Sequence, residues 1–199
     1  MESAANIVVH DMYMVVLWDT NYFEPRPDDK RICGRRVAEG LFSIEAYATN
    51  TRPEHRLAHA LAMRVVPVVQ QKIKECEAEL RQTHQVLGSE LGASWVAGMK
   101  VEEPVAKEWQ LGIPKGRSTP TAVAFLRLFL IMDEVTANLK KLHYKGALTR
   151  SEYKSRENVY AKPLRKLMND LQLLNKQFHG QRRALNGQSV NPAAAVAQA

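Results

Sequence analysis

The chain has 199 residues, a net charge of +7 and a hydrophobic fraction of 45%. This length suits one domain, or one domain with a small appendage, and allows a buried core. No stretch approaches the roughly 18 unbroken apolar residues of a membrane span, and residues 1–6 carry no export signal. Cys33 and Cys76 lie too far apart to suggest a disulfide framework or a zinc ribbon. We therefore expect a cytoplasmic protein that does not contact a membrane.

The positive charge is unevenly distributed along the chain. Residues 140–183 hold twelve basic and three acidic side chains, so this segment alone exceeds the net charge of the whole protein. A second basic cluster consists of Lys30, Arg31, Arg35 and Arg36. A basic run is usually a solvated face, but an excess this large favours contact with the phosphates of double-stranded DNA.

The N-terminal part of the chain predicts two strands. Residues 6–18 are rich in Val, Ile, Tyr and Met and predict a strand, which a Pro-rich loop at 24–29 ends. Residues 41–51 alternate between apolar and polar side chains, which is typical of a half-buried strand. Its outward set would be Ser43, Glu45, Tyr47 and Thr49.

The next residues predict a short helix followed by a longer one. Thr51 or Arg52 would cap a helix that starts at Pro53 and continues to about Arg64. Pro67 should then break this helix or start a new one. Beyond Pro67, apolar residues recur every three or four positions and predict a packing seam that ends at the glycines of 88–92. This seam consists of Val69, Ile73, Cys76, Leu80, Thr83 and Leu87.

The C-terminal half predicts helices after a long connection. Residues 93–120 lack a sustained period and predict a connection with short helical pieces, whereas residues 121–142 predict an amphipathic helix. Thr149 or Ser151 would cap a further helix, and Pro163 would mark the first turn of the last one or a kink in it. The seam of this last helix runs from Tyr160 to Phe178, and residues 187–199 predict disorder.

Two segments resemble the AcaB-like proteins of conjugative plasmids and integrating conjugative elements. The segment 43–64 carries the alternating strand, then Thr51-Arg52, then Arg56-Leu57 on the following helix. The segment 125–152 carries a leucine-rich helix with an embedded acid, Asp133, and then His143 before a short turn and Thr149-Arg150. One departure is Ala62-Met63-Arg64, where relatives tend to show Gly-Arg.

The resemblance implies a transcriptional activator of conjugation genes, built on a ribbon-helix-helix unit and mainly α-helical with a short β ribbon. Two chains would pair their strands in the major groove, with Ser43, Glu45, Tyr47 and Thr49 facing the bases. The expected partners are promoter DNA, a second copy, and other transcriptional activators or RNA polymerase. The residues expected to contact phosphates are Arg52, Arg56, Arg35, Arg36, Lys140, Lys141, Lys145, Arg150, Lys154, Lys162, Arg165 and Lys166.

With this unit, the chain divides into five predicted regions. Residues 1–40 would form an N-terminal strand and basic loop, and 41–92 the ribbon-helix-helix unit. Residues 93–120 would be a connecting segment, 121–186 a basic helical region and 187–199 a disordered tail.

Other interpretations remain open. On composition alone, residues 41–51 fit an ordinary edge strand with a solvated polar face. His55 and His59 are four residues apart on a predicted helix and could both bind one metal ion, but the sequence has no third ligand at a spacing typical of a metal site. Residues 112–118 only faintly resemble a phosphate-binding loop, so we expect no catalytic residue, metal or cofactor. The alternative to a regulator is a helical scaffold or relaxosome accessory protein that binds DNA non-specifically.

Overall fold

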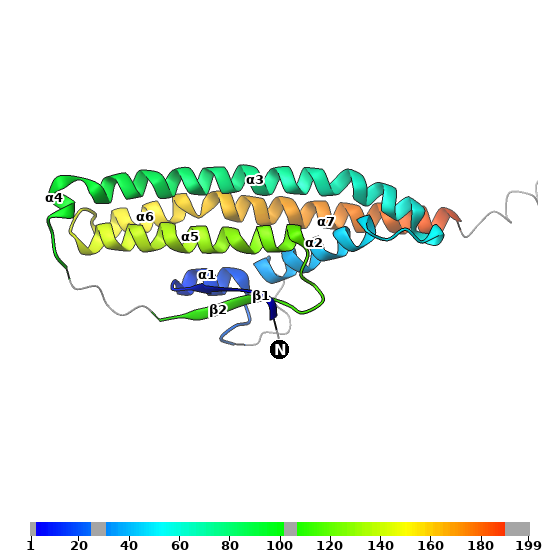
Figure 1. Ribbon diagram of the computed structural model, residues 1–199, viewed down its shortest axis with the longest axis horizontal. Helices are drawn as coiled ribbons and strands as arrows, with labels where there is room; N and C mark the ends of the chain where they lie inside the picture. Colours follow the sequence, from blue (N-terminus) through cyan, green and yellow to red (C-terminus); the bar gives the residue numbers. More distant parts are fainter. Residues whose placement is uncertain (1–2, 25–30, 102–106, 190–199) are drawn as a thin grey trace, which may run out of the picture.

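The computed structural model describes residues 3–24, 31–101 and 107–189. Three helices, α3 (Arg56–Gly92), α5 (Pro120–Tyr144) and α7 (Lys162–Ser189), run lengthwise beside one another in an elongated bundle (Figure 1). The helix α2 (Gly34–Ala48) packs against all three, and α6 (Arg150–Tyr160) leads into α7. A small sheet and α1 (Met12–Trp18) lie on the side of α5 that faces away from α3 (Figure 1).

The first predicted strand is only partly correct. β1 (Ser3–Val9) is a strand, but the residues that follow it form α1. Asp11 caps α1, because its side chain accepts a hydrogen bond from the backbone N–H of Tyr13 at 2.7 Å. Met14, Val15 and Trp18 then bury one face of this helix, a spacing that suits a helix and not a strand.

The second predicted strand is wrong, and with it the ribbon-helix-helix fold class. Residues 41–51 belong mostly to α2, whose buried residues Val37, Ala38, Leu41 and Ile44 recur with a helical period. The alternation from residue 41 onward fits a strand equally well when it is seen alone. Val37 and Ala38, which precede this segment, show that the buried residues recur with a helical period. The other helices of the bundle bury the apolar face of α2. Among the described residues, strands occur only in the small sheet.

α3 is continuous where a break was predicted. Pro53–His55 form a single 3-10 turn, and α3 then runs through Pro67 to Gly92. A proline removes one backbone N–H from the helix, but Pro67 is exposed, so this loss falls on the side of α3 that faces away from the core. The predicted seam is confirmed, since Val69, Ile73, Cys76, Leu80 and Leu87 are all buried. Packing along this seam stabilises one helix rather than two.

The predicted connection at 93–120 contains a strand that sequence reasoning missed. After the short α4 (Ser94–Ala97), β2 (Trp109–Pro114) pairs antiparallel with β1, with Ile7 opposite Leu111 and Val9 opposite Trp109. β2 has only six residues and includes Gly112 and Pro114, which are both disfavoured in strands, so its sequence alone does not predict a strand. The partner strand lies about a hundred positions earlier in the chain.

The C-terminal predictions are largely confirmed. α5 covers the predicted amphipathic helix, Thr149 caps α6 in a reciprocal capping box with Glu152, and Pro163 lies in the first turn of α7. α7 continues to Ser189, so its last three residues overlap the start of the predicted tail. Residues 190–199 and 25–30 lie outside the described residues, and the latter range includes Lys30 and most of the Pro-rich loop predicted at 24–29.

The core lies between α5 and the elements around it. Trp18 meets Phe129 edge-on with ring centroids 5.0 Å apart, and Phe125 meets Phe129 at 5.5 Å. Gly34 lets α2 approach these rings, because a Cβ there would lie 2.6 Å from both Phe129 and Trp18. None of the described helices is both long and apolar enough to cross a membrane.

Candidate nucleic-acid interface

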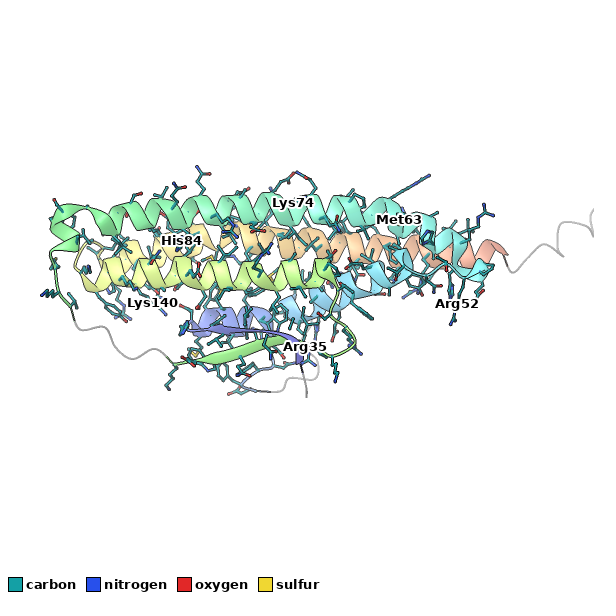
Figure 2. All side chains as sticks on the ribbon, viewed as in Figure 1. Arg35, Arg52, Met63, Lys74, His84 and Lys140 are labelled. Carbon is teal, nitrogen blue, oxygen red and sulfur yellow. The ribbon has the colours of Figure 1, made fainter. Side chains whose placement is uncertain are left out.

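One end of the bundle gathers basic side chains from α3 and α7. The start of α3 and the end of α7 lie side by side there (Figure 1), and Figure 2 labels Arg52 at this end. Across residues 49–64 and 174–185 the sequence has one acid, Glu54. We call the cations of these two segments the basic tip: Arg52, Arg56, Arg64, Lys176, Arg182 and Arg183.

Among the described residues, no acid forms an ion pair with the basic tip. Its side chains are exposed except for Arg182, which is half-buried. The N-terminus of α3, the positive end of its dipole, lies at the same place. This end therefore carries a local positive field suited to an anionic partner.

Arg182 holds the basic tip together. Its guanidinium lies 4.8 Å from the centre of the Tyr47 ring and donates a hydrogen bond to the Tyr47 hydroxyl. The Tyr47 ring also packs against Phe178 at 5.8 Å, and His59 Nδ1 lies 3.3 Å from the Tyr47 carbonyl oxygen. Residues from α2, α3 and α7 are thus fixed to one another behind the exposed arginines.

A histidine reports the local field. The pKa of His179 is lowered, first because the ring is partly buried and then because Arg182 and Arg183 repel its positive form. The repulsion by Arg182 and Arg183 lowers the pKa in the direction expected where positive charges are close together.

The four residues predicted to face bases do not form an exposed row. Ser43, Glu45 and Tyr47 lie in α2, and Thr49 is its C-cap. Glu45 accepts hydrogen bonds from the hydroxyl of Thr121 at 3.0 Å and from its backbone N–H at 3.3 Å. Tyr47 packs inside the basic tip, and the Thr49 hydroxyl donates to backbone carbonyls of its own helix. Glu45 and Tyr47 therefore have structural contacts that a ribbon would not provide.

Many residues predicted to contact phosphates form hydrogen bonds or ion pairs with other residues of the protein, although Arg36 and Lys154 are exposed. Two of them bind acids near the N-terminus: Lys140 contacts Asp11 at 2.8 Å, and Arg35 contacts Asp19 at 3.0 Å. Four more of them donate hydrogen bonds to other residues: Arg165 to the Tyr13 hydroxyl, Lys145 to the Val96 carbonyl, Lys154 to Glu157, and Arg36 to the Arg31 carbonyl.

The remaining predicted cations are dispersed. Lys162 and Lys166 line a groove of about 310 Å³ between α3 and α7, in which Lys72 binds Asp170 at 2.9 Å. Two further acids, Glu75 and Glu79, also line this groove, so its charge is mixed. Arg150 begins α6 and Lys141 lies near the end of α5, away from the basic tip. Of the predicted phosphate contacts, only Arg52 and Arg56 belong to the basic tip.

The prediction missed four members of the basic tip. Lys176, Arg182 and Arg183 were counted in the basic segment 140–183 but were not selected, and Arg64 was noted only as a departure from the AcaB-like pattern. The available signal was the absence of any acid after Asp170. No group of three His, Cys, Asp or Glu among the described residues is placed to hold a metal.

The class that these features define is an elongated helical bundle with a small sheet at its side and a basic end. The chain is similar to AcaB from uropathogenic E. coli, with a TM-score of 0.65 and 14% identity over 95% of this chain and 88% of that one. No family model matches the sequence, and no match was found among curated proteins. The resemblance to AcaB-like proteins is thus confirmed for the fold.

Proposed function

We propose that this chain is a DNA-binding protein that regulates genes of a conjugative element and acts by binding rather than by catalysis. The observation that carries the proposal is the basic tip, six cations with no ion pair among the described residues. The AcaB-like fold and the resemblance to AcaB-like regulators give the proposal its biological setting.

The chemistry of the basic tip suits phosphates. Exposed arginines can donate two parallel hydrogen bonds to phosphate oxygens, and they release counterions from DNA when they bind. Arg52, Arg56 and Arg183 would contact the DNA backbone, while Arg182 would hold α7 against α2 through Tyr47. A homodimer would present two basic tips to one DNA duplex. That the chain forms a homodimer remains a prediction.

The test is a comparison of affinities over a range of salt concentrations. A promoter fragment of the parent element and a random duplex of equal length are titrated with the protein, and binding is followed by fluorescence anisotropy. A regulator should prefer the promoter by about a thousandfold or more. Nearly equal affinities would instead support the non-specific scaffold or relaxosome accessory protein.

A matched pair of double variants locates the interface. Arg56→Gln with Arg183→Gln removes two exposed charges of the basic tip, whereas Lys74→Gln with Arg150→Gln removes two exposed charges elsewhere. Because each phosphate contact contributes about 0.9 to the salt slope, the first pair should lower the slope by about two and the second should leave it unchanged. Equal losses in both pairs would show that the basic tip is not the interface.

A further inference from the structure

An apolar strip faces outward on the first turns of α3. Leu57 and Met63 are each 54% exposed and Val68 is 46% exposed. Ala60 and Pro67 are exposed between them. The opposite side of these turns is buried in the bundle, so the strip is not the packing face of α3. Single exposed apolar residues are ordinary on a protein surface, but Leu57, Ala60, Met63 and Pro67 recur three or four residues apart and so lie next to one another on α3. Val68 lies one turn beyond Arg64, on the other side of that arginine.

The surroundings of this strip are basic. From His55 to Lys74 the sequence contains no acid, and Arg56 and Arg64 lie on the same turns as the apolar residues. Both arginines are exposed, and neither forms an ion pair within the described ranges. Figure 2 labels Met63 on α3 toward the same end of the bundle as Arg52. The strip therefore combines apolar area with positive charge.

We propose that the apolar strip of α3 docks an acidic amphipathic helix of a protein partner. The apolar side chains of such a helix would cover Leu57, Met63 and Val68, while its flanking carboxylates would pair with Arg56 and Arg64. This surface overlaps the basic tip at Arg56 and Arg64, so the partner helix and DNA would compete for these two arginines, whereas the apolar side chains would serve the partner alone.

A second copy of this chain fits the strip less well. A symmetric dimer places the same patch against itself, so the arginines of one strip would meet those of the other. With no acid between residues 55 and 74, nothing in the strip offsets this repulsion. Charge complementarity therefore favours a partner that supplies the acids.

The test uses synthetic peptides as probes for the full chain. One peptide is helical, with leucines along one face and glutamates on both flanks, and a second has lysines in place of the glutamates. A third has the composition of the first in scrambled order. Calorimetry should show that the acidic helical peptide binds at least about tenfold more tightly than the other two. Equal binding of all three, or no binding of the acidic peptide, would overturn the proposal.

Two valines of α3 give a matched pair of variants. Val68 lies in the strip and is 46% exposed, whereas Val86 lies about five turns further along α3 and is 48% exposed. Val68→Asp should weaken acidic-peptide binding at least about tenfold, and Val86→Asp should leave it unchanged. Circular dichroism checks that both variants fold.

Charge reversal and oligomeric state complete the test. Arg64→Glu should shift the preference toward the lysine peptide. Equal effects of the two valine variants would contradict the docking site. A dimer in light scattering that Val68→Asp dissociates, and Val86→Asp does not, would assign the strip to a second copy and overturn the proposal.

Discussion

Replacing Asp133 with Ala tests how the N-terminal segment is attached to the bundle. Asp133 lies in the middle of α5 and is only 3% exposed. Its carboxylate accepts hydrogen bonds from the backbone N–H of His10 at 2.9 Å and of Asp11 at 2.8 Å, and it lies 3.0 Å from His10 Nδ1. One carboxylate thus holds the turn between β1 and α1.

The expected loss follows from the donors that the variant leaves unpaired. A buried donor without a partner costs about 1–3 kcal/mol. Asp11 is buried, whereas the His10 side chain is 44% exposed and water can reach that side. We therefore expect Asp133→Ala to lower the free energy of unfolding by about 2–4 kcal/mol, which corresponds to a fall in Tm of about 4–16 °C for a chain of this size.

Chemical and thermal unfolding followed by circular dichroism measures this loss. The neighbouring Glu134→Ala is the control, because Glu134 is exposed and lies 3.9 Å from His84, so its removal should change stability by less than about 0.5 kcal/mol. Hydrogen exchange should show faster exchange of the Asp11 amide in Asp133→Ala. If Asp133→Ala behaved like Glu134→Ala, the carboxylate would not be what anchors the turn.

Three further variants probe packing, helix continuity and pH dependence. Gly34→Ala should destabilise by about 1–3 kcal/mol in urea unfolding, because its Cβ would lie 2.6 Å from the rings of Phe129 and Trp18; unchanged stability would show that the rings move freely. Pro67→Ala should raise Tm by restoring a helical hydrogen bond worth about 1–2 kcal/mol net, and a lower Tm would mean that the proline is needed. The fold lowers the pKa of His179, so the folded state takes up this proton less readily than the unfolded chain. The contribution of His179 to stability is complete above the usual histidine pKa of about 6.5 and is lost as pH falls through that value and then through the lower folded one. In His179→Gln the free energy of unfolding should therefore fall less between about pH 7 and about pH 5; an unchanged slope would contradict this.

The AcaB-like fold is recognisable from sequence in its long helices. The seams of α3 and α7, the extent of α5 and the Thr149 cap of α6 all follow from spacings within a few turns of one helix. These spacings are local and repeat many times, so a single interruption such as Pro67 does not obscure the helix to which it belongs.

Short segments were decided by their neighbours in space. Residues 41–51 are compatible with a strand period and with a helical one, and the surface offered by α3, α5 and α7 selects the helix. β2 forms because β1 lies beside it, although the two strands are about a hundred residues apart in sequence. No local pattern contains that information.

The basic tip shows the same division. The amino-acid sequence by itself determined the excess of positive charge and its concentration toward the C-terminus. Only the tertiary structure decided which cations are available, because it brings Asp11 to Lys140 and Asp19 to Arg35, while Arg56 and Arg183 have no acid beside them among the described residues. The physical reason is that a charge is neutralised by whatever lies within a few ångströms of it, and those neighbours come from distant parts of the chain.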